Sequence, residues 1–412
     1  MGARGPAHPI VFLLLYLPFG ASAGYGGVAL AYLLHQRGVS VAAIAAMGAL
    51  NVLPNTWKVF WAPLVDTTLS ARAWYLLGLS VTAAVFLITA AAPLGPQSLP
   101  LLDALSFALG LASSLLAIAA DRFMAYDTPE EEKGRAGGWA QAGNLGGGGL
   151  GGGLALWVAV HTGQPWTAGV LLAVLSLACA IMAFRVNDPP RVEAGRPFLS
   201  VVKDTGKDVL GLALRRAGLL AIFVCLLPLG SGGAGALWSA VAGDWGAGAD
   251  EVALVGGVLS GVVSIVGAIA GGYVCDRMDR KGAYVLFGLA SAASAVAMAL
   301  GPRTPLAFMV FASVYNLVLG ACYAAFSGLT LEAIGQGAAG TKYNLLASVS
   351  NVPVMLMPLL VAWANKRWGS SGMLYIEALC AVAAAALYTA VVHATRGWRW
   401  PWRLRLAGAP GD

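Results

Sequence analysis

The sequence predicts an all-α polytopic membrane protein made of two related bundles of six transmembrane helices each. Hydrophobic residues make up 58% of the 412 residues and charged residues only 11%, compared with roughly 25% charged residues in an average soluble domain. Apolar runs of roughly 20 residues, the length at which a helix crosses a bilayer, recur along the whole chain. Landmarks of the first half also return in the second half, as expected of a duplicated unit.

Short polar or proline-containing breaks divide the apolar runs into twelve predicted spans. The spans of the first half are 10–34, 41–65, 73–93, 99–121, 136–161 and 165–185. Those of the second half are 218–243, 252–274, 282–300, 305–330, 343–365 and 372–394. The chain has 54 glycines, which let membrane helices approach closely, and Gly143 to Gly153 is the densest stretch.

The two halves share one plan. Leu17-Pro18-Phe19-Gly20 returns as Leu227-Pro228-Leu229-Gly230, a shift of 210 residues that also carries Asp66 to Asp276. The first span is therefore expected to be a structural helix of a repeat and not a cleavable signal peptide. We expect an N-terminal bundle over 1–187, a cytoplasmic linker over 188–216, a C-terminal bundle over 217–396 and a cytoplasmic tail over 397–412.

The basic residues predict the topology. With the N-terminus inside, all but four of the 25 lysines and arginines fall on the inner side or in inner helix halves. The four exceptions are Arg37, Arg303, Lys366 and Arg367. The net charge of +6 therefore reflects topology and not nucleic-acid binding. We expect a monomeric multi-pass protein of a bacterial inner membrane, with the lipid bilayer around it and both termini cytoplasmic.

Other function classes lack their residues. The five cysteines and four histidines are scattered without the spacing of a metal site. No His, Asp and Ser constellation marks an enzyme site at a membrane face, and the tails and linker are too short for a sensor domain. The sequence thus favours a transporter of a small molecule, with no cofactor and no metal.

Two related loops identify a family. Lys58-Val59-Phe60-Trp61-Ala62-Pro63-Leu64-Val65-Asp66 lies at the end of the second span, and Gly272 to Lys281 lies at the end of the eighth. The second loop resembles the motif of glycine, aspartate and basic residues of the major facilitator superfamily. The first looks like the element shared by the peptide/acetyl-coenzyme A transporter branch, which includes muropeptide permeases of the AmpG type, acetyl-coenzyme A carriers and relatives proposed to import siderophores.

The resemblance implies a site between the two halves, which rock to give alternating access. It also implies a cytoplasmic gate, because an acid at the inner end of a helix can pair with cations or with the positive N-terminus of a neighbouring helix. We assign Asp276, Arg277 and Arg280 to this gate. In the second copy an arginine directly follows Asp276, whereas in the first copy Thr67 follows Asp66. The first basic residue after Asp66 is Arg72. We therefore expect a looser gate from Asp66 and Arg72.

Lys58 is the most informative single residue, since it lies about two helical turns inside Asp66. In one interpretation its side chain snorkels to the inner interface. In the other it has a site role, in which it binds a substrate carboxylate or phosphate or forms an ion pair that changes when a proton binds. Asp121 and Glu332, which close the fourth and tenth spans, either anchor the chain at the inner interface or couple transport to protons. In the coupling hypothesis Asp121 titrates with Lys58.

Polar and aromatic residues in mid-span form a second candidate set. Each residue alone is more often a contact between helices, but the set lies on spans expected to line a central cavity, and amides with aromatic planes suit an amphiphilic or sugar-bearing solute. With Lys58, the substrate-binding candidates are Tyr25, Asn51, Asn55, Gln141, Asn144, Trp238, Tyr315, Asn316, Tyr323 and Asn351.

The sequence favours proton-driven import of a bulky anionic or amphiphilic solute such as a muropeptide, peptide or siderophore. Two alternatives stay open, namely proton-coupled efflux of amphiphilic compounds and transport of an acyl-coenzyme A. Efflux ranks lower because the Gly143–Gly153 run lacks the proline of the fifth-helix motif of drug/proton antiporters.

Overall fold

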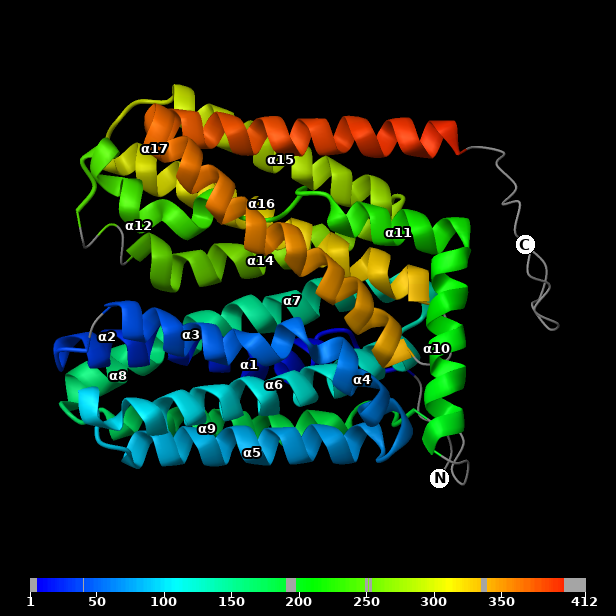
Figure 1. Cartoon of the computed structure of the whole chain (residues 1–412), viewed down its shortest axis with the longest axis horizontal. Helices are drawn as coiled ribbons and strands as arrows, with labels where there is room; N and C mark the ends of the chain where they lie inside the picture. The colour runs from blue at the N-terminus through cyan, green and yellow to red at the C-terminus, as the bar shows by residue number, and fades with distance from the viewer. Residues whose placement is uncertain are drawn as a thin grey trace.

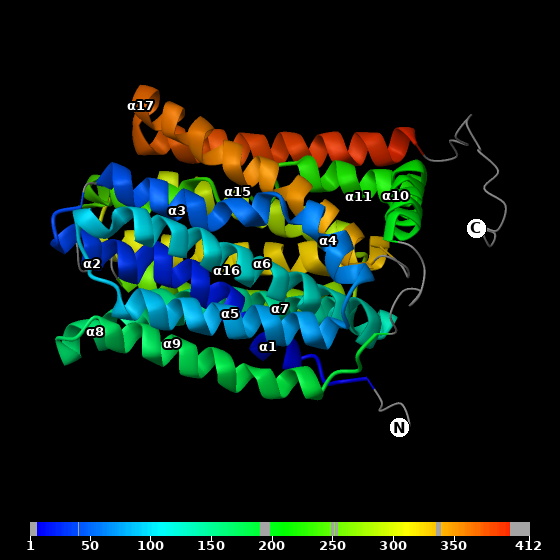
Figure 2. The same ribbon diagram turned by 60° about the horizontal axis from the view of Figure 1, so that its bottom comes forward.

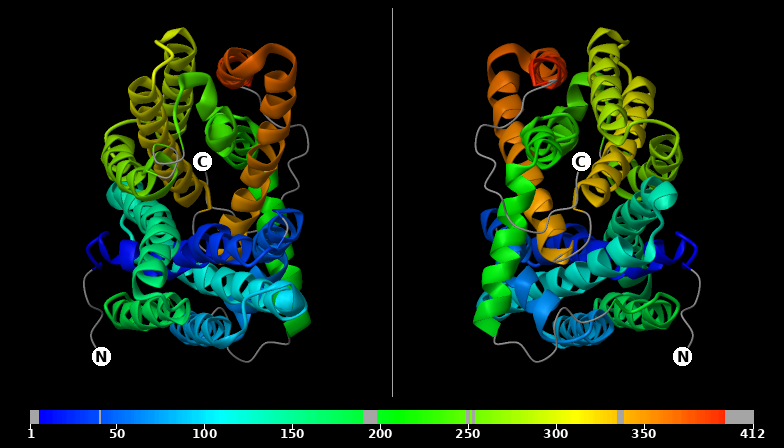
Figure 3. Two further views of the ribbon diagram at one scale, coloured as in Figure 1. Left: turned by 90° about the vertical axis from the view of Figure 1, so that its left-hand side faces the viewer. Right: turned by 90° about the vertical axis from the view of Figure 1, so that its right-hand side faces the viewer.

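The computed structural model describes residues 6–39, 41–189, 198–248, 251, 254–334 and 339–395, and contains no strand within them. Two helical bundles lie side by side, with the helices up to α9 in one and those from α11 in the other (Figure 1). The helix α10 (Phe198–Leu214) crosses from one bundle to the other at one end (Figure 3). We call this end the linker end and the other the distal end.

The N-terminal bundle contains the first six predicted spans. The first is α1 (Val11–Gly24), the π-helix η1 (Tyr25–Leu30) and α2 (Ala31–Gln36), and the second is α3 (Val41–Thr56) with α4 (Lys58–Thr67). The third is α5 (Ala71–Ala91) and the fourth α6 (Leu99–Asp127), preceded by η2 (Pro96–Ser98). After η3 (Glu130–Glu132), the fifth is α7 (Lys133–Gly149), η4 (Leu150–Leu154) and α8 (Ala155–Thr162). The sixth is α9 (Trp166–Cys179) with η5 (Ala180–Phe184).

The C-terminal bundle contains the other six. The seventh span is α11 (Arg216–Leu226), followed by η6 (Ala234–Leu237), α12 (Trp238–Val241) and η7 (Ala242–Trp245). The eighth is η8 (Val255–Leu259) with α14 (Ser260–Cys275), the ninth α15 (Arg280–Leu300) and the tenth α16 (Pro305–Ile334). The last two spans form α17 (Ala339–Ala394), which is kinked at Gly369, where φ is 69°. In Figure 2, α9 and the C-terminal part of α17 lie on opposite sides of the molecule.

The twelve-span prediction is confirmed, although several spans are not continuous apolar helices. In the described part of the chain, seven continuous helical segments are long and apolar enough to cross a membrane, and one of them, Thr341–Ala394, holds two spans. Helix breaks or glycine-rich stretches interrupt the second, fifth, seventh and eighth spans. Interrupted helices are typical of transporters, where the irregular backbone is buried in protein or lines a cavity.

Glycines bring α1 and α7 into backbone contact. A Cβ added to Gly143 would stand 2.1 Å from the Leu13 carbonyl oxygen, and one added to Gly147 would stand 2.3 Å from that of Leu17. In the other direction, a Cβ on Gly20 would stand 1.8 Å from the Asn144 carbonyl oxygen. The glycine run therefore serves close packing between helices, as small residues do in membranes.

The seventh span differs from the sequence prediction, which treats 218–243 as uninterrupted. The helix stops at Leu226, and the next helical turn begins at Ala234. Pro228 lacks an N–H for a helical hydrogen bond, and Gly232 takes a left-handed φ of 68°. Pro18 of the matching tetrapeptide lies inside the continuous α1, so the repeated sequence does not fix the local structure.

Candidate functional site

At the linker end, the carboxylate of Asp276 joins the two bundles. Asp276 follows the last residue of α14 and faces the first turn of α7, whose N–H groups have no partner inside their own helix. Its oxygens accept from the backbone N–H of Gly134 at 2.7 Å and of Arg135 at 3.0 Å, and from Arg135 Nε at 2.8 Å. The negative charge also meets the positive end of the α7 dipole.

Arg280 makes a second connection between the bundles. Its guanidinium donates to Glu130 Oε1 at 2.7 Å and to Glu332 Oε2 at 3.2 Å. Lys281 donates to Glu332 Oε1 at 2.7 Å, and Lys133 Nζ donates to the Leu331 carbonyl at 3.1 Å. Glu130 and Lys133 belong to the N-terminal bundle, and Arg280, Lys281, Leu331 and Glu332 belong to the C-terminal bundle. We call these contacts together with those of Asp276 the linker-end latch; they hold the two bundles together at this end.

Glu130 is the exposed member of this latch. Burial on its own would raise the pKa of the Glu130 carboxyl, but hydrogen bonds from Lys133 and Arg280 outweigh it and bring the pKa below its ordinary value. Its side chain is 59% exposed, and an exposed ion pair is worth at most about 1 kcal/mol. The side chains of Arg280 and Asp276 are only 10% and 8% exposed. Their charges are therefore less screened by solvent than that of Glu130.

The other predicted gate residues lie apart from this latch. Arg277 is exposed and donates to the Tyr273 carbonyl of its own helix at 3.0 Å. Arg72 donates to the carbonyls of Ala183 at 2.9 Å and Val186 at 3.1 Å, so these bonds stay within the N-terminal bundle. The side chain of Asp66 lies outside the described residues. The gating roles of these three residues stay predictions.

Deeper in the molecule, Lys58 and Asp121 are buried close to each other. Their side-chain charges interact electrostatically, and Lys58 Nζ lies 5.9 Å from the centre of the Phe19 ring. The residues are 8% and 1% exposed. Tyr16 of α1 donates its hydroxyl to Asp121 Oδ1. The arrangement brings α1, α4 and α6 together around one cation and one carboxylate.

A chain of polar side chains extends across the two bundles beside this pair. Tyr343 of α17 interacts electrostatically with Asp121 and donates to Ser327 Oγ at 3.1 Å. Ser327 also accepts from Gln141 Nε2 at 2.8 Å, and Gln141 Oε1 accepts from Asn144 Nδ2 at 3.1 Å. The structure thus brings Lys58, Asp121, Gln141 and Asn144 into one buried polar region, which we call the central cluster.

Tyr16, Ser327 and Tyr343 belong to the central cluster but are absent from the predicted set. Each is a residue type that is common in membrane helices and carries no charge, so its sequence position alone gives no signal. Glu332, predicted to couple protons, instead contacts Arg280 and Lys281 in the linker-end latch. Its coupling role stays a prediction.

The contacts described for the remaining candidates lie apart from the central cluster. Tyr25 packs edge-on against Phe86 at 5.4 Å, and Asn51 Nδ2 donates to the Ser106 carbonyl at 3.2 Å, both within the N-terminal bundle. Trp238 and Tyr315 stack edge to face at 5.3 Å in the core of the C-terminal bundle. Four further candidates have half-buried side chains, namely Asn55, Asn316, Tyr323 and Asn351. Their binding roles stay predictions.

Glu377 is a buried acid that the predicted set does not include. It is 5% exposed on the part of α17 beyond Gly369, and it accepts from the Tyr315 hydroxyl and from the Ala234 N–H. An ionisable residue inside the apolar span 372–394 is itself a sequence signal. Among the described residues, no group of three His, Cys, Asp or Glu could hold a metal ion.

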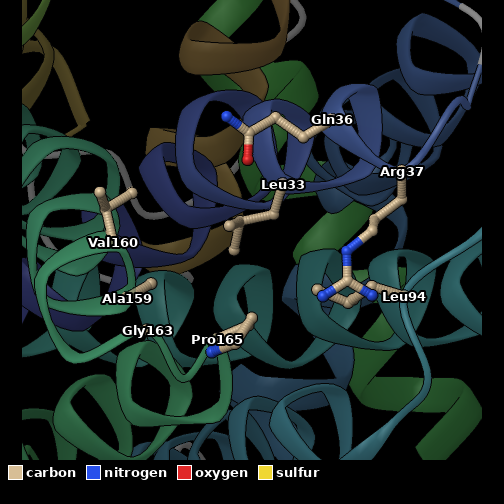
Figure 4. A pocket seen from close by; sticks show the side chains of 8 residues that line it. All are labelled: Leu33, Gln36, Arg37, Leu94, Ala159, Val160, Gly163 and Pro165. Carbon is tan, nitrogen blue, oxygen red and sulfur yellow. The ribbon is translucent and has the colours of Figure 1, made fainter.

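A small pocket at the distal end of the N-terminal bundle is separate from the central cluster. Leu33, Gln36, Arg37 and Leu94 line it together with Ala159, Val160, Gly163 and Pro165, and Figure 4 shows the Arg37 side chain reaching toward Leu94. Its volume of about 220 Å³ is below the roughly 300–1,000 Å³ of pockets for drug-sized ligands. It is therefore too small for a bulky solute.

Known proteins resemble this chain in sequence and in fold. The sequence profile of the Major Facilitator Superfamily matches residues 12–234. The anhydromuropeptide permease of Escherichia coli K12 is 25% identical over 339 residues, which cover 79% of this chain and 68% of that protein. The transporter AmpG 4 of Rickettsia felis is 25% identical over 338 residues, which cover 77% of this chain and 80% of that protein.

Among solved structures, the transporter FucP in its outward conformation superposes with a TM-score of 0.69 at 15% identity, over 92% of this chain and 98% of its own. This likeness covers both bundles and supports the twelve-helix fold. The profile match over more than half of the chain shows that this protein belongs to the Major Facilitator Superfamily, a family of membrane transporters and not of enzymes, and its curated relatives are AmpG-like permeases.

Proposed function

We propose that this protein imports a bulky anionic or amphiphilic solute of the muropeptide class across the bacterial inner membrane, driven by protons. The observation that carries the proposal is the burial of Lys58 beside Asp121, with Tyr16 and Tyr343 of different bundles around the carboxylate. The sequence relationship to a protein named anhydromuropeptide permease supports the solute class. The branch resemblance leaves peptides and siderophores as the nearest competitors.

The charges suggest how uptake is coupled to protons. We place the linker end in the cytoplasm, because most basic residues lie on that side; the linker-end latch then closes the cytoplasmic side in this state. A solute carboxylate that pairs with Lys58 takes the cation away from Asp121. A buried carboxylate without its cation is costly, so Asp121 takes up a proton from the outside. Solute anion and proton then enter together without leaving a net charge in the site.

Release into the cytoplasm reverses these steps. Once the linker-end latch opens, the Asp121 proton leaves to the cytoplasm, and the carboxylate competes with the solute for Lys58. The solute is displaced because the attraction between Lys58 and the charged Asp121 is restored. Tyr16 positions the carboxylate for this exchange through its hydroxyl hydrogen bond.

The decisive experiment measures uptake of labelled anhydromuropeptide into proteoliposomes under an imposed inward pH gradient. We expect accumulation above the outside concentration, which ends when a protonophore collapses the gradient. Asp121→Asn should lose accumulation and keep exchange of internal for external solute, because exchange needs no net proton movement. The same helix offers a matched control, Asp127→Asn, because Asp127 accepts from the Ala7 N–H at 3.2 Å and from Asn187 Nδ2 at 2.6 Å, away from the pair.

Other results would give other functions. Accumulation of a ferric siderophore or of an acyl-coenzyme A in place of the muropeptide would change the solute and leave the coupling. Proton-driven loss of a preloaded amphiphile would indicate efflux. Accumulation by Asp121→Asn equal to that of the unmodified protein would refute the role of Asp121.

A further inference from the structure

The broken seventh span is held in place by one buried carboxylate. Between Leu226 and Ala234 the backbone leaves the helix, and Gly232 has a φ of 68°. Glu377 Oε2 accepts from the Ala234 N–H at 2.7 Å, and the backbone of Gly233 adds a second hydrogen bond to the same carboxyl group. Glu377 Oε1 accepts from the Tyr315 hydroxyl. The acid therefore ties α17 to the segment that restarts the seventh span and to α16.

Glu377 lies within the membrane-spanning part of α17. It follows the kink at Gly369 by eight residues, about 12 Å along a helix, and its side chain is 5% exposed. Among the described residues it takes part in no ion pair within 4.0 Å. The titratable side chains that interact with it are Tyr315 of α16 and Cys380 of its own helix. The cation Arg303 interacts with Ser370, Ser371 and the face of Trp245.

All of the hydrogen-bonding neighbours of Glu377 are donors. A carboxylate can accept from every one of them, whereas a protonated carboxyl must itself donate one hydrogen bond. Backbone N–H groups cannot accept, and the Tyr315 hydroxyl can accept only by turning its own proton elsewhere. Protonation also removes the charge that makes the bonds to the backbone stronger than neutral ones.

We propose that Glu377 is a second proton-binding residue of this transporter, and that its protonation releases the segment from Leu227 to Val241 from α17. In the unprotonated form the carboxylate anchors Gly233 and Ala234 and keeps the break in one conformation. In the protonated form these bonds weaken, and the seventh span is free to move at the distal end. The inference goes beyond the proposed function and does not depend on Asp121.

The test is hydrogen–deuterium exchange of the purified full-length protein in lipid nanodiscs at about pH 5 and about pH 8. Rates are corrected for the intrinsic effect of pH. In the unmodified protein, peptides covering 227–241 should exchange faster at the lower pH. Glu377→Gln, which cannot ionise, should exchange fast at both values, while peptides of α15 stay protected. The proposal fails if Glu377→Gln keeps the pH dependence, or if the unmodified protein has none in 227–241.

Infrared difference spectra between the same two pH values give an independent measurement. A carbonyl band of a protonated carboxyl that forms at the lower pH should persist in Asp121→Asn and be lost or reduced in Glu377→Gln; bands of equal size in the unmodified protein and in Glu377→Gln contradict the proposal. The Asp121→Asn sample separates this inference from the proposed function, because the role of Asp121 and the role of Glu377 are tested independently.

If Glu377→Gln does not fold, Tyr315→Phe serves in its place. Loss of that donor should move the midpoint of the exchange transition to higher pH, and an unchanged midpoint overturns the proposal.

Discussion

The Asp276 carboxylate accepts a hydrogen bond of 2.7 Å from the backbone N–H of Gly134, across the contact of the two bundles. The contact is tight because Gly134 has no side chain. A Cβ at this position would stand 2.5 Å from Asp276 Oδ1 and 2.7 Å from the Gly272 carbonyl oxygen. One residue pair thus combines charge, a helix N-terminus and close backbone approach at the linker end.

Gly134→Ala should open the linker end. The added methyl group must displace Asp276 or the α14 backbone, and overpacking of this kind costs about 1–3 kcal/mol. Spin labels at the exposed Leu69 and Met278 should report a longer and broader distance distribution than in the unmodified protein. The control Gly48→Ala, which meets no atom within 4 Å, should leave the distribution unchanged; equal distributions in both variants would show that the contact does not hold the end closed.

Acid should weaken the linker-end latch through Glu130. The pKa of Glu130 is lowered in the closed state by Lys133 and Arg280, so its stabilisation is fully present above the ordinary carboxyl pKa of about 4.3. That stabilisation is lost as the pH falls through the lowered value. The spin-label distance should therefore be constant near neutral pH and lengthen below about pH 4. Glu130→Gln should remove this acid-induced step in the distance, and a step of the same size in that variant would assign it to another group.

Ser327→Ala should destabilise the contact between α7, α16 and α17. The change leaves the Gln141 amide and the Tyr343 hydroxyl without their shared acceptor, and an unsatisfied buried polar group costs about 1–3 kcal/mol. The melting temperature in detergent should fall. The matched control is Ser294→Ala, because Ser294 is also buried but donates only to the Ser291 carbonyl of its own helix. A fall of equal size in both variants would mean that the shared acceptor is unimportant.

Gly147→Ala should impair folding of the N-terminal bundle. Its Cβ would stand 2.3 Å from the Leu17 carbonyl oxygen, so α1 and α7 would have to separate along their glycine contact. We expect a lower yield of monodisperse protein on size-exclusion chromatography and a lower melting temperature. Gly27→Ala, whose Cβ meets nothing within 4 Å, is the control and should behave like the unmodified protein.

The sequence could predict a feature wherever its physical cause is local. A charged residue such as Lys58 or Asp121 inside an apolar span is costly whichever way its helix faces. Its position in the sequence alone therefore marks it as a candidate. The acid of the second loop could likewise be selected as a gate candidate, because a carboxylate at a helix end interacts with the dipole or cation beside it. Tyr16 and Tyr343 carry no such cost and could not be selected.

By itself, the sequence determined the twelve spans, their division into two halves and the family, because hydrophobic length and repeated motifs are properties of the chain. The tertiary structure decided which polar groups meet. It placed Tyr16 against Asp121 and Ser327 between Gln141 and Tyr343, and it gave Glu377 the donors of a broken helix. These pairings depend on how each helix is rotated and how closely its neighbours approach, and both follow from packing between segments far apart in the chain.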